Sequence, residues 1–123
     1  MASALTTIAV IDDDEGVRAA MSQLLRAASY AAVAYASAED FLRSPEAASV
    51  DCLIVDVNLP GMSGAALLQT LAARGSRIPA ILISARDDLT TRELVRVSGA
   101  VPFLRKPFGS GELFAAITGV LRS

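Results

Sequence analysis

Short apolar runs alternate along this chain with longer segments whose apolar residues recur at helical spacing. This alternation constrains the fold more than any other feature, because it is typical of strand–helix units around a parallel sheet. Five such units fit the 123 residues. The predicted strands are Thr7 to Ile11, Ala31 to Ala36, Cys52 to Val57, Ala80 to Ser84 and Val101 to Leu104. The length is that of one domain, so we expect residues 1–123 to form a single unit.

Amphipathic segments between these runs predict the helices. They are one that carries Val17 to Ala28, one capped by Ser37, one from about Gly64, one from Asp88 to about Ser98, and one that opens near Ser110 or Gly111. The first, third and fourth strands are apolar nearly throughout, which suits strands covered on both faces. Pro102 removes one ladder donor from the fifth, which should lie at an edge. The pattern is consistent with an α/β, doubly wound, flavodoxin-like sheet of order 2-1-3-4-5.

The unusual polar residues fall where strands end. Asp12 and Asp13 follow the first strand, Asp56 lies at the end of the third, Ser84 ends the fourth and Lys106 follows the fifth. The carboxyl ends of parallel strands share one rim, where ligands of open α/β sheets bind. We therefore expect these five side chains to converge on one crevice.

This set of residue types indicates a particular chemistry. Three close carboxylates repel one another unless a cation holds them together, and their oxygens suit a hard divalent ion such as Mg²⁺. Lys106 would add a fixed positive charge and Ser84 a hydrogen bond to phosphoryl oxygens. Asp56 is then the nucleophile, because an ionised carboxylate attacks phosphorus without a strong base.

Composition excludes several other classes. The net charge of −2 argues against a basic nucleic-acid-binding module, and the absence of histidine excludes a Cys/His zinc site or a histidine triad. Cys52 is the only cysteine, so no intrachain disulfide forms, and in its apolar run it reads as a buried hydrophobe. No long apolar stretch predicts export or a membrane span, and a reducing cytoplasm fits best.

Four ordered segments resemble the receiver domain of bacterial two-component response regulators. They are IDDDE at Ile11 to Glu15, DVNLPGMSG at Asp56 to Gly64, ISA at Ile83 to Ala85, and FLRKPF at Phe103 to Phe108. The resemblance covers essentially the whole chain, in the family's order and spacing. It implies a single receiver domain over residues 1–123 that works as a phosphoacceptor switch rather than as an enzyme, apart from its own phosphorylation and dephosphorylation.

The resemblance also implies roles for single residues. Asp56 would be the phosphoacceptor, held with Mg²⁺ by Asp13 directly, by Asp12 through water or as a supporting carboxylate, and by the backbone carbonyl of Asn58. Ser84 and Lys106 would hold the phosphoryl group. Phe103 matches the aromatic switch position that turns inward as the Ser84 loop closes, and the Lys106–Pro107 bond matches one that is often cis.

Two departures accompany this match. Ser84 stands where threonine is more frequent, which keeps the hydroxyl, and Phe103 lacks the phenolic hydroxyl that a tyrosine would carry. Asn58 and Arg86 fall at positions that tune how fast the phosphoryl group leaves. Asp14 and Glu15 are interpreted as a helix N-terminal charge cluster rather than as ligands.

Several functional alternatives remain at this point. A partner histidine kinase or histidine phosphotransfer protein would phosphorylate Asp56 and switch the face formed by the fourth helix, fifth strand and fifth helix, and that face would act on a protein partner or an output domain. The apolar residues of the fifth helix would either form a homodimer through this face or simply pack against the sheet. A small Mg²⁺-dependent aspartyl phosphohydrolase is the enzymatic alternative, although Asn58 cannot protonate a leaving group. A receiver-like module that never cycles phosphate is the third. We expect no membrane contact and no direct nucleic-acid binding.

Overall fold

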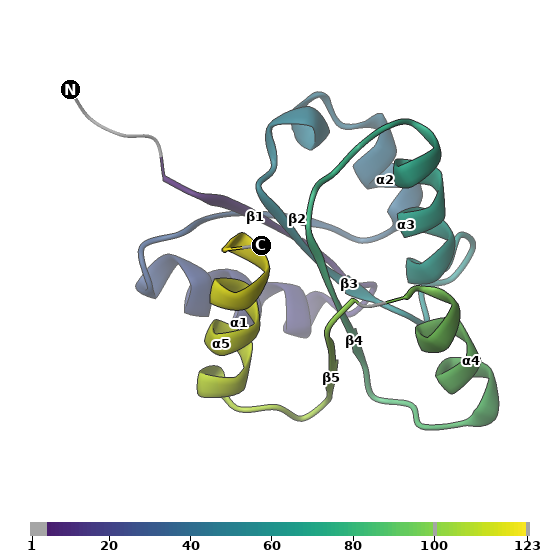
Figure 1. Cartoon of the computed structure of the whole chain (residues 1–123). Coiled ribbons are helices and arrows are strands. Elements are labelled where there is room, and N and C mark those ends of the chain that lie inside the picture. Colours follow the sequence, from purple (N-terminus) through teal and green to yellow (C-terminus); the bar gives the residue numbers. More distant parts are fainter. Residues whose placement is uncertain (1–4, 100, 123) are drawn as a thin grey trace.

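A five-stranded parallel sheet lies between two layers of helices in the computed structural model, which describes residues 5–99 and 101–122 (Figure 1). The strands are β1 Thr7–Ile11, β2 Ala31–Tyr35, β3 Cys52–Asp56, β4 Ala80–Ser84 and β5 Phe103–Arg105. The helices are α1 Glu15–Ala27, α2 Ala38–Arg43, α3 Gly64–Ala73, α4 Leu89–Val97 and α5 Ser110–Leu121, with a 3₁₀ turn, η1, at Pro45–Ser49.

The strand order β2-β1-β3-β4-β5 confirms the predicted doubly wound topology. All strand pairs are parallel, and the register places Val10 opposite Ile54 and Ile54 opposite Ile81. Every residue of β3 and β4 is buried, as is β1 after Thr7, which confirms that these strands are covered on both faces. The last strand, β5, pairs with β4 alone and lies at an edge, as Pro102 indicated.

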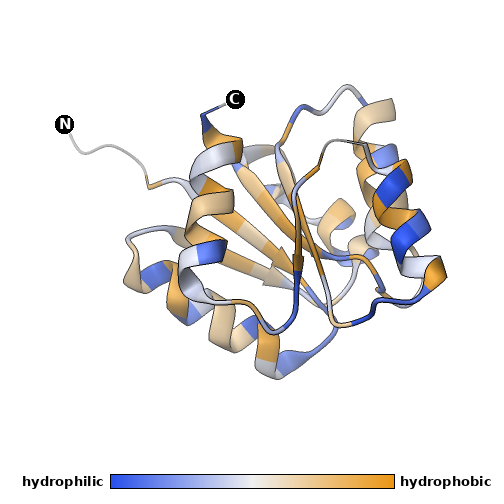
Figure 2. Ribbon diagram, turned by 60° about the horizontal axis from the view of Figure 1, so that its bottom comes forward, coloured by the Kyte–Doolittle hydropathy of each residue, from blue (hydrophilic) through white to orange (hydrophobic). Residues whose placement is uncertain are grey.

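Alternate residues of each central strand point to opposite helical layers, because side chains alternate across a strand. Ile8, Ile54 and Ile83 pack under α1 and α5 with Leu25 and Leu113. Their neighbours along the strands face α2 and α3, where Phe41 and Leu67 are fully buried. Apolar strands lie inside the layers and polar helix residues are spread over the outside (Figure 2). The two layers fix the sheet rigidly and so fix the rim at its carboxyl ends.

Side-chain caps define where four of the helices begin. Asp14, Ser37, Ser63 and Asp88 each accept the backbone N–H three residues further on, which satisfies an otherwise unpaired helix donor. The predicted capping role of Ser37 is thereby confirmed, and Asp14 caps α1 in agreement with its interpretation as a helix-terminal charge. The boundaries of α4 agree with the prediction, since Asp88 caps it and Ser98 ends it.

β2 and β3 each end one residue earlier than predicted, at Tyr35 and Asp56, and β5 ends one residue later, at Arg105. Two further differences have a physical reason. The fifth strand begins at Phe103 rather than at Val101, because Pro102 contributes only its carbonyl oxygen, which accepts from the Leu82 N–H. The η1 turn was not predicted; it begins at Pro45, which suits the first position of a helical turn. Neither difference moves a residue of the predicted rim.

The longest described helix has 13 residues, and none of the described helices has the length and apolar character that crossing a bilayer requires. The prediction of one unit over residues 1–123 stays a prediction, because residues 1–4, 100 and 123 lie outside the described part.

Candidate functional site

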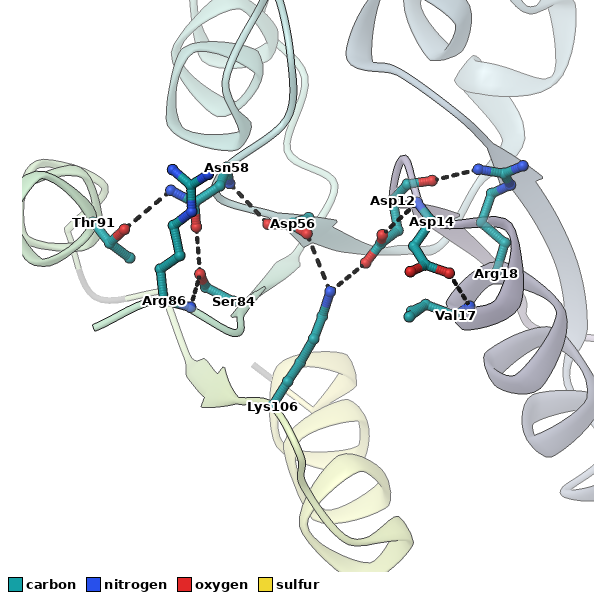
Figure 3. A network of polar contacts seen from close by, with 10 residues as sticks. All are labelled: Asp12, Asp14, Val17, Arg18, Asp56, Asn58, Ser84, Arg86, Thr91 and Lys106. Carbon is teal, nitrogen blue, oxygen red and sulfur yellow. Dashed lines mark hydrogen bonds and ion pairs between the residues drawn. The ribbon is translucent and has the colours of Figure 1, made fainter. Parts of the chain in front are cut away.

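Lys106 lies between two carboxylates at the rim formed by the carboxyl ends of the strands (Figure 3). Its Nζ is 2.7 Å from Asp12 Oδ2 and 3.1 Å from Asp56 Oδ2. These residues are 94 and 50 positions apart from Lys106 in the sequence. The parallel sheet brings them together because Asp12 follows β1, Asp56 ends β3 and Lys106 follows β5. The Lys106–Pro107 peptide bond is cis.

A third acid completes the group. Oxygen atoms of Asp12, Asp13 and Asp56 lie within 4.8 Å of one another. Asp12 is fully buried and Asp56 is 7% exposed, whereas Asp13 is exposed. Ionised together, the three acids leave two negative charges that the single lysine does not balance. Such a set of oxygens suits a hard divalent cation, and solvent reaches it at Asp13.

Local hydrogen bonds orient the two buried acids. Asp12 Oδ1 accepts the Asp14 N–H at 2.9 Å, and its carbonyl accepts Arg18 Nη1 at 2.8 Å. Asp56 Oδ1 accepts the Asn58 N–H at 2.8 Å. The remaining oxygen of each acid faces Lys106. Burial alone would lower the pKa of Lys106, but hydrogen bonding to Asp12 and the charge of Asp56 outweigh it and raise that pKa.

Ser84 is the last residue of β4, and its hydroxyl is turned to Asn58. It donates to Asn58 Oδ1 and accepts the Arg86 N–H at 3.0 Å. The Asn58 Nδ2 then donates to Thr91 Oγ1 at 3.0 Å, so the side chains of Ser84, Asn58 and Thr91 form one chain that reaches α4 (Figure 3). Among the described residues, no hydrogen bond joins Ser84 to Asp56. Ser84 is therefore at the predicted rim, with its hydroxyl engaged elsewhere.

Phe103 lies on β5 beside α4, half-buried against the layer that contains α3 and α4. With Thr91, Val95, Arg86 and other residues it lines a cavity of about 150 Å³. In the sheet, β4 lies between Phe103 on β5 and Asp56 on β3.

Three residues that sequence reasoning had not placed at the site support it. Thr91 is 1% exposed and is the polar member of the inward stripe of α4, which was its only signal. Glu39, on α2, accepts the Met62 N–H at 3.1 Å through Oε2 and so ties down the loop after Asp56. Gly64 was predicted as the start of the third helix; a Cβ there would lie 2.5 Å from the Asp56 carbonyl oxygen, so this backbone contact requires glycine.

Comparison with known proteins decides the family. Residues 8–118 match the response regulator receiver domain. The chain is a response regulator receiver domain. It is 35% identical over 122 residues to the response regulator protein TodT of Pseudomonas putida, covering 99% of this chain and 54% of TodT. It is 35% identical over 112 residues to the transcriptional regulatory protein FixJ of Azorhizobium caulinodans, covering 91% of this chain and 53% of FixJ.

A solved receiver domain agrees in structure as well. The response regulator receiver protein from Burkholderia phymatum is 37% identical, with a TM-score of 0.80 and 94% of each chain covered. The chain spans about half the length of the curated relatives it matches. Receiver domains are signalling domains that work with histidine kinases and are not classical enzymes. These matches give the domain a phosphoacceptor function and do not favour the phosphohydrolase alternative.

Proposed function

We propose that this receiver domain accepts a phosphoryl group on Asp56 and that the modification reshapes the surface formed by α4, β5 and α5. The observation that carries this proposal is the position of the Asp56 carboxylate, held by the Asn58 N–H and the Lys106 ammonium beside two further acids. A carboxylate so placed is oriented and lies next to a fixed positive charge, which is what attack on phosphorus requires.

The transfer makes one bond and breaks one. A carboxylate oxygen of Asp56 attacks the phosphorus of a phosphohistidine on the donor; the phosphorus–nitrogen bond breaks, and its electron pair stays on the imidazole, which then takes a proton. The Lys106 ammonium group stabilises the negative charge on the oxygens of the transferred phosphoryl group. Water later attacks the acyl phosphate, releases inorganic phosphate and restores the carboxylate. Asn58 and Arg86 are placed beside Ser84, where they would influence this second step.

Mg²⁺ fits the donor set. Asp13, Asp12 and Asp56 would hold it through their carboxylates and Asn58 through its carbonyl oxygen, which accepts no hydrogen bond from the described residues. When bound, the ion would neutralise charge on the transferring phosphoryl group. The exposure of Asp13 leaves an open side through which a phosphoryl donor would approach.

Ser84 and Phe103 are proposed as the switch. A phosphoryl group adds about two negative charges and three acceptor oxygens, which compete for the Ser84 hydroxyl. Movement of Ser84 would pull on the segment leading to α4, and Phe103 borders the cavity beside that helix. The new arrangement would then change what the α4, β5 and α5 face binds.

The partners follow from this chemistry. A histidine kinase or a histidine phosphotransfer protein would supply the phosphoryl group, and an output domain, a separate protein or a second copy of this chain would occupy the switched face. We propose that residues 1–123 act as one receiver unit without contacting nucleic acid or membrane themselves. The single buried cysteine is consistent with work in the reducing cytoplasm.

The experiment is phosphorylation by a small donor. Acetyl phosphate with Mg²⁺ should add one phosphoryl mass to the wild type, and Asp56→Asn should abolish the gain. Asp51→Asn, which neutralises an exposed acid at the opposite end of β3, is the matched control and should be phosphorylated like the wild type. An Asp56→Asn protein that still gains the full mass would contradict the proposal.

A second assay separates signalling from hydrolysis. A receiver should show essentially no turnover of ordinary phosphomonoesters, because Asn58, two residues after Asp56, cannot protonate an alkoxide leaving group as a second acid would. Sustained turnover that depends on Asp56 would favour the phosphohydrolase.

A further inference from the structure

Beyond the residues proposed for phosphoryl transfer, we propose that Thr91 is a positioning residue that holds Ser84 away from Asp56 through the Asn58 side chain. This inference rests on the proposed function, since it concerns how the domain resists adopting the phosphorylated arrangement. It is carried by three buried or half-buried side chains and the hydrogen bonds that connect them (Figure 3).

Both polar atoms of the Asn58 side-chain amide are engaged in this arrangement. Its oxygen accepts the Ser84 hydroxyl and its nitrogen donates to Thr91 Oγ1 at 3.0 Å. Its own backbone N–H is fixed separately by Asp56 Oδ1. The amide therefore clamps two points of one segment, the end of β4 and the first turn of α4, to the loop that follows the phosphoacceptor.

The Ser84 hydroxyl is equally committed. Its single proton goes to Asn58 while its oxygen accepts the Arg86 N–H at 3.0 Å. A hydroxyl has one proton to donate, so Ser84 cannot donate to a phosphoryl oxygen until the bond to Asn58 breaks. The resting network competes directly with the phosphorylated one for the same proton.

Thr91 stabilises the resting network by holding the Asn58 side chain in place. Without a partner for Nδ2, the half-buried Asn58 side chain would be free to turn towards water, and its oxygen would no longer be held in front of Ser84. Thr91 is fixed on the other side because its N–H donates to the capping Asp88 at 2.8 Å. The cavity of about 150 Å³ bordered by Thr91 and Phe103 leaves room for this segment to shift once the clamp opens.

Substitution at Thr91 tests the clamp, with its neighbour as a control. Thr91→Val keeps the shape and the backbone cap but removes the hydroxyl, whereas Thr91→Ser keeps the hydroxyl. Thr90→Val makes the same chemical change one residue earlier, on an exposed position of the same helix. Thr91→Ala removes the hydroxyl without adding a methyl group and is made in case the valine variant fails to fold.

The measured quantity is the dissociation constant of beryllofluoride, a phosphoryl mimic, in the presence of Mg²⁺. Loss of one net hydrogen bond from the resting state should tighten binding roughly two- to tenfold in Thr91→Val or Thr91→Ala. Thr91→Ser and Thr90→Val should match the wild type. The side-chain amide protons of Asn58 should exchange faster in Thr91→Val, while its backbone amide proton, held by Asp56, should not change.

The outcomes separate the two proposals. If Thr91→Val and Thr91→Ala bind beryllofluoride as tightly as the wild type or more weakly, the clamp is overturned and the phosphoacceptor proposal still stands. An equal tightening in Thr90→Val would also overturn it, because the effect would then belong to the helix and not to the Asn58 contact. A wild type that binds no beryllofluoride at all would overturn the proposed function and this inference with it.

Discussion

Lys106 supplies the positive charge that partly balances the acids of the site. Its ammonium group pairs with two acids, of which Asp12 has no solvent exposure at all. A buried carboxylate without a partner is strongly unfavourable, so this lysine stabilises the fold as well as any phosphoryl group that arrives.

Lys106→Met should therefore lower the free energy of unfolding by roughly 1–3 kcal/mol in the absence of divalent ions. Mg²⁺ should restore more stability in the variant than in the wild type, because the cation then meets three acids with no competing lysine. Urea unfolding of both proteins with and without Mg²⁺ measures this difference. An equal effect of Mg²⁺ on the two proteins would count against the proposed metal position.

Cys52 is a residue whose thiol reactivity is suppressed by its position. It is buried in β3, and burial raises the pKa of its thiol to about 12. The reactive thiolate is therefore rare at neutral pH, which agrees with its interpretation as a small hydrophobe.

At the scale of elements, α2 holds the loop that follows the phosphoacceptor. The Met62 N–H donates to Glu39 and lowers the pKa of that carboxyl from 4.5. A pKa lower in the folded than in the unfolded state means that the stabilising contribution is present above about pH 4.5 and is lost as the pH falls through the folded value.

The amide proton of Met62 should accordingly shift with a midpoint below 4.5 in an acid titration followed by NMR. Glu39→Ala should remove this transition and speed exchange of the Met62 amide, with Asn58 unaffected. A Met62 midpoint at or above 4.5 would show that the carboxylate does not hold this loop.

The junction of β3 and α3 depends on a close backbone approach. Gly64→Ala should push the start of α3 off the Asp56 carbonyl and lower the free energy of unfolding by roughly 1–3 kcal/mol, as overpacking does. Gly111→Ala is the matched control, because its added methyl group meets nothing, and helix propensity should make it more stable by roughly 0.5–1 kcal/mol. Chemical denaturation compares the two, and a neutral Gly64→Ala would contradict the packing described.

At the scale of the whole molecule, the switch should link the rim to the face of α4, β5 and α5. Helix α4 carries exposed apolar residues, Leu89 at 81% and Val97 at 44%, and exposed ion pairs join Asp87 to Arg92 on α4 and to Arg105 on β5. Exposed pairs of this kind contribute little to stability, so the face is able to rearrange.

Beryllofluoride with Mg²⁺ should change amide hydrogen exchange in this face and leave α1 and α2 largely as they were. Deuterium uptake followed by mass spectrometry, with and without the mimic, measures it. Unchanged protection from Asp88 to Leu121 would contradict the proposed output surface.

The topology and the meeting of Asp12, Asp56 and Lys106 were predictable from sequence, because a parallel sheet brings the carboxyl ends of its strands to one rim. The edge position of the fifth strand was also predictable, because Pro102 lacks a backbone donor for the ladder. The direction of the Ser84 hydroxyl was not predictable, since it depends on which neighbour takes its proton. Thr91 was equally hidden, because a threonine on an inward helix stripe reads as simple packing until Asn58 is seen to reach it.

Chemical location of the phosphoryl group tests the central claim most directly. The domain is treated with acetyl phosphate and Mg²⁺, reduced with borohydride, which converts an aspartyl phosphate to homoserine, and then mapped by peptide mass spectrometry. We predict conversion at Asp56 and at no other acid. Conversion at Asp12 or Asp13 with Asp56 intact, or no conversion at all, would contradict the assignment of Asp56 as the phosphoacceptor.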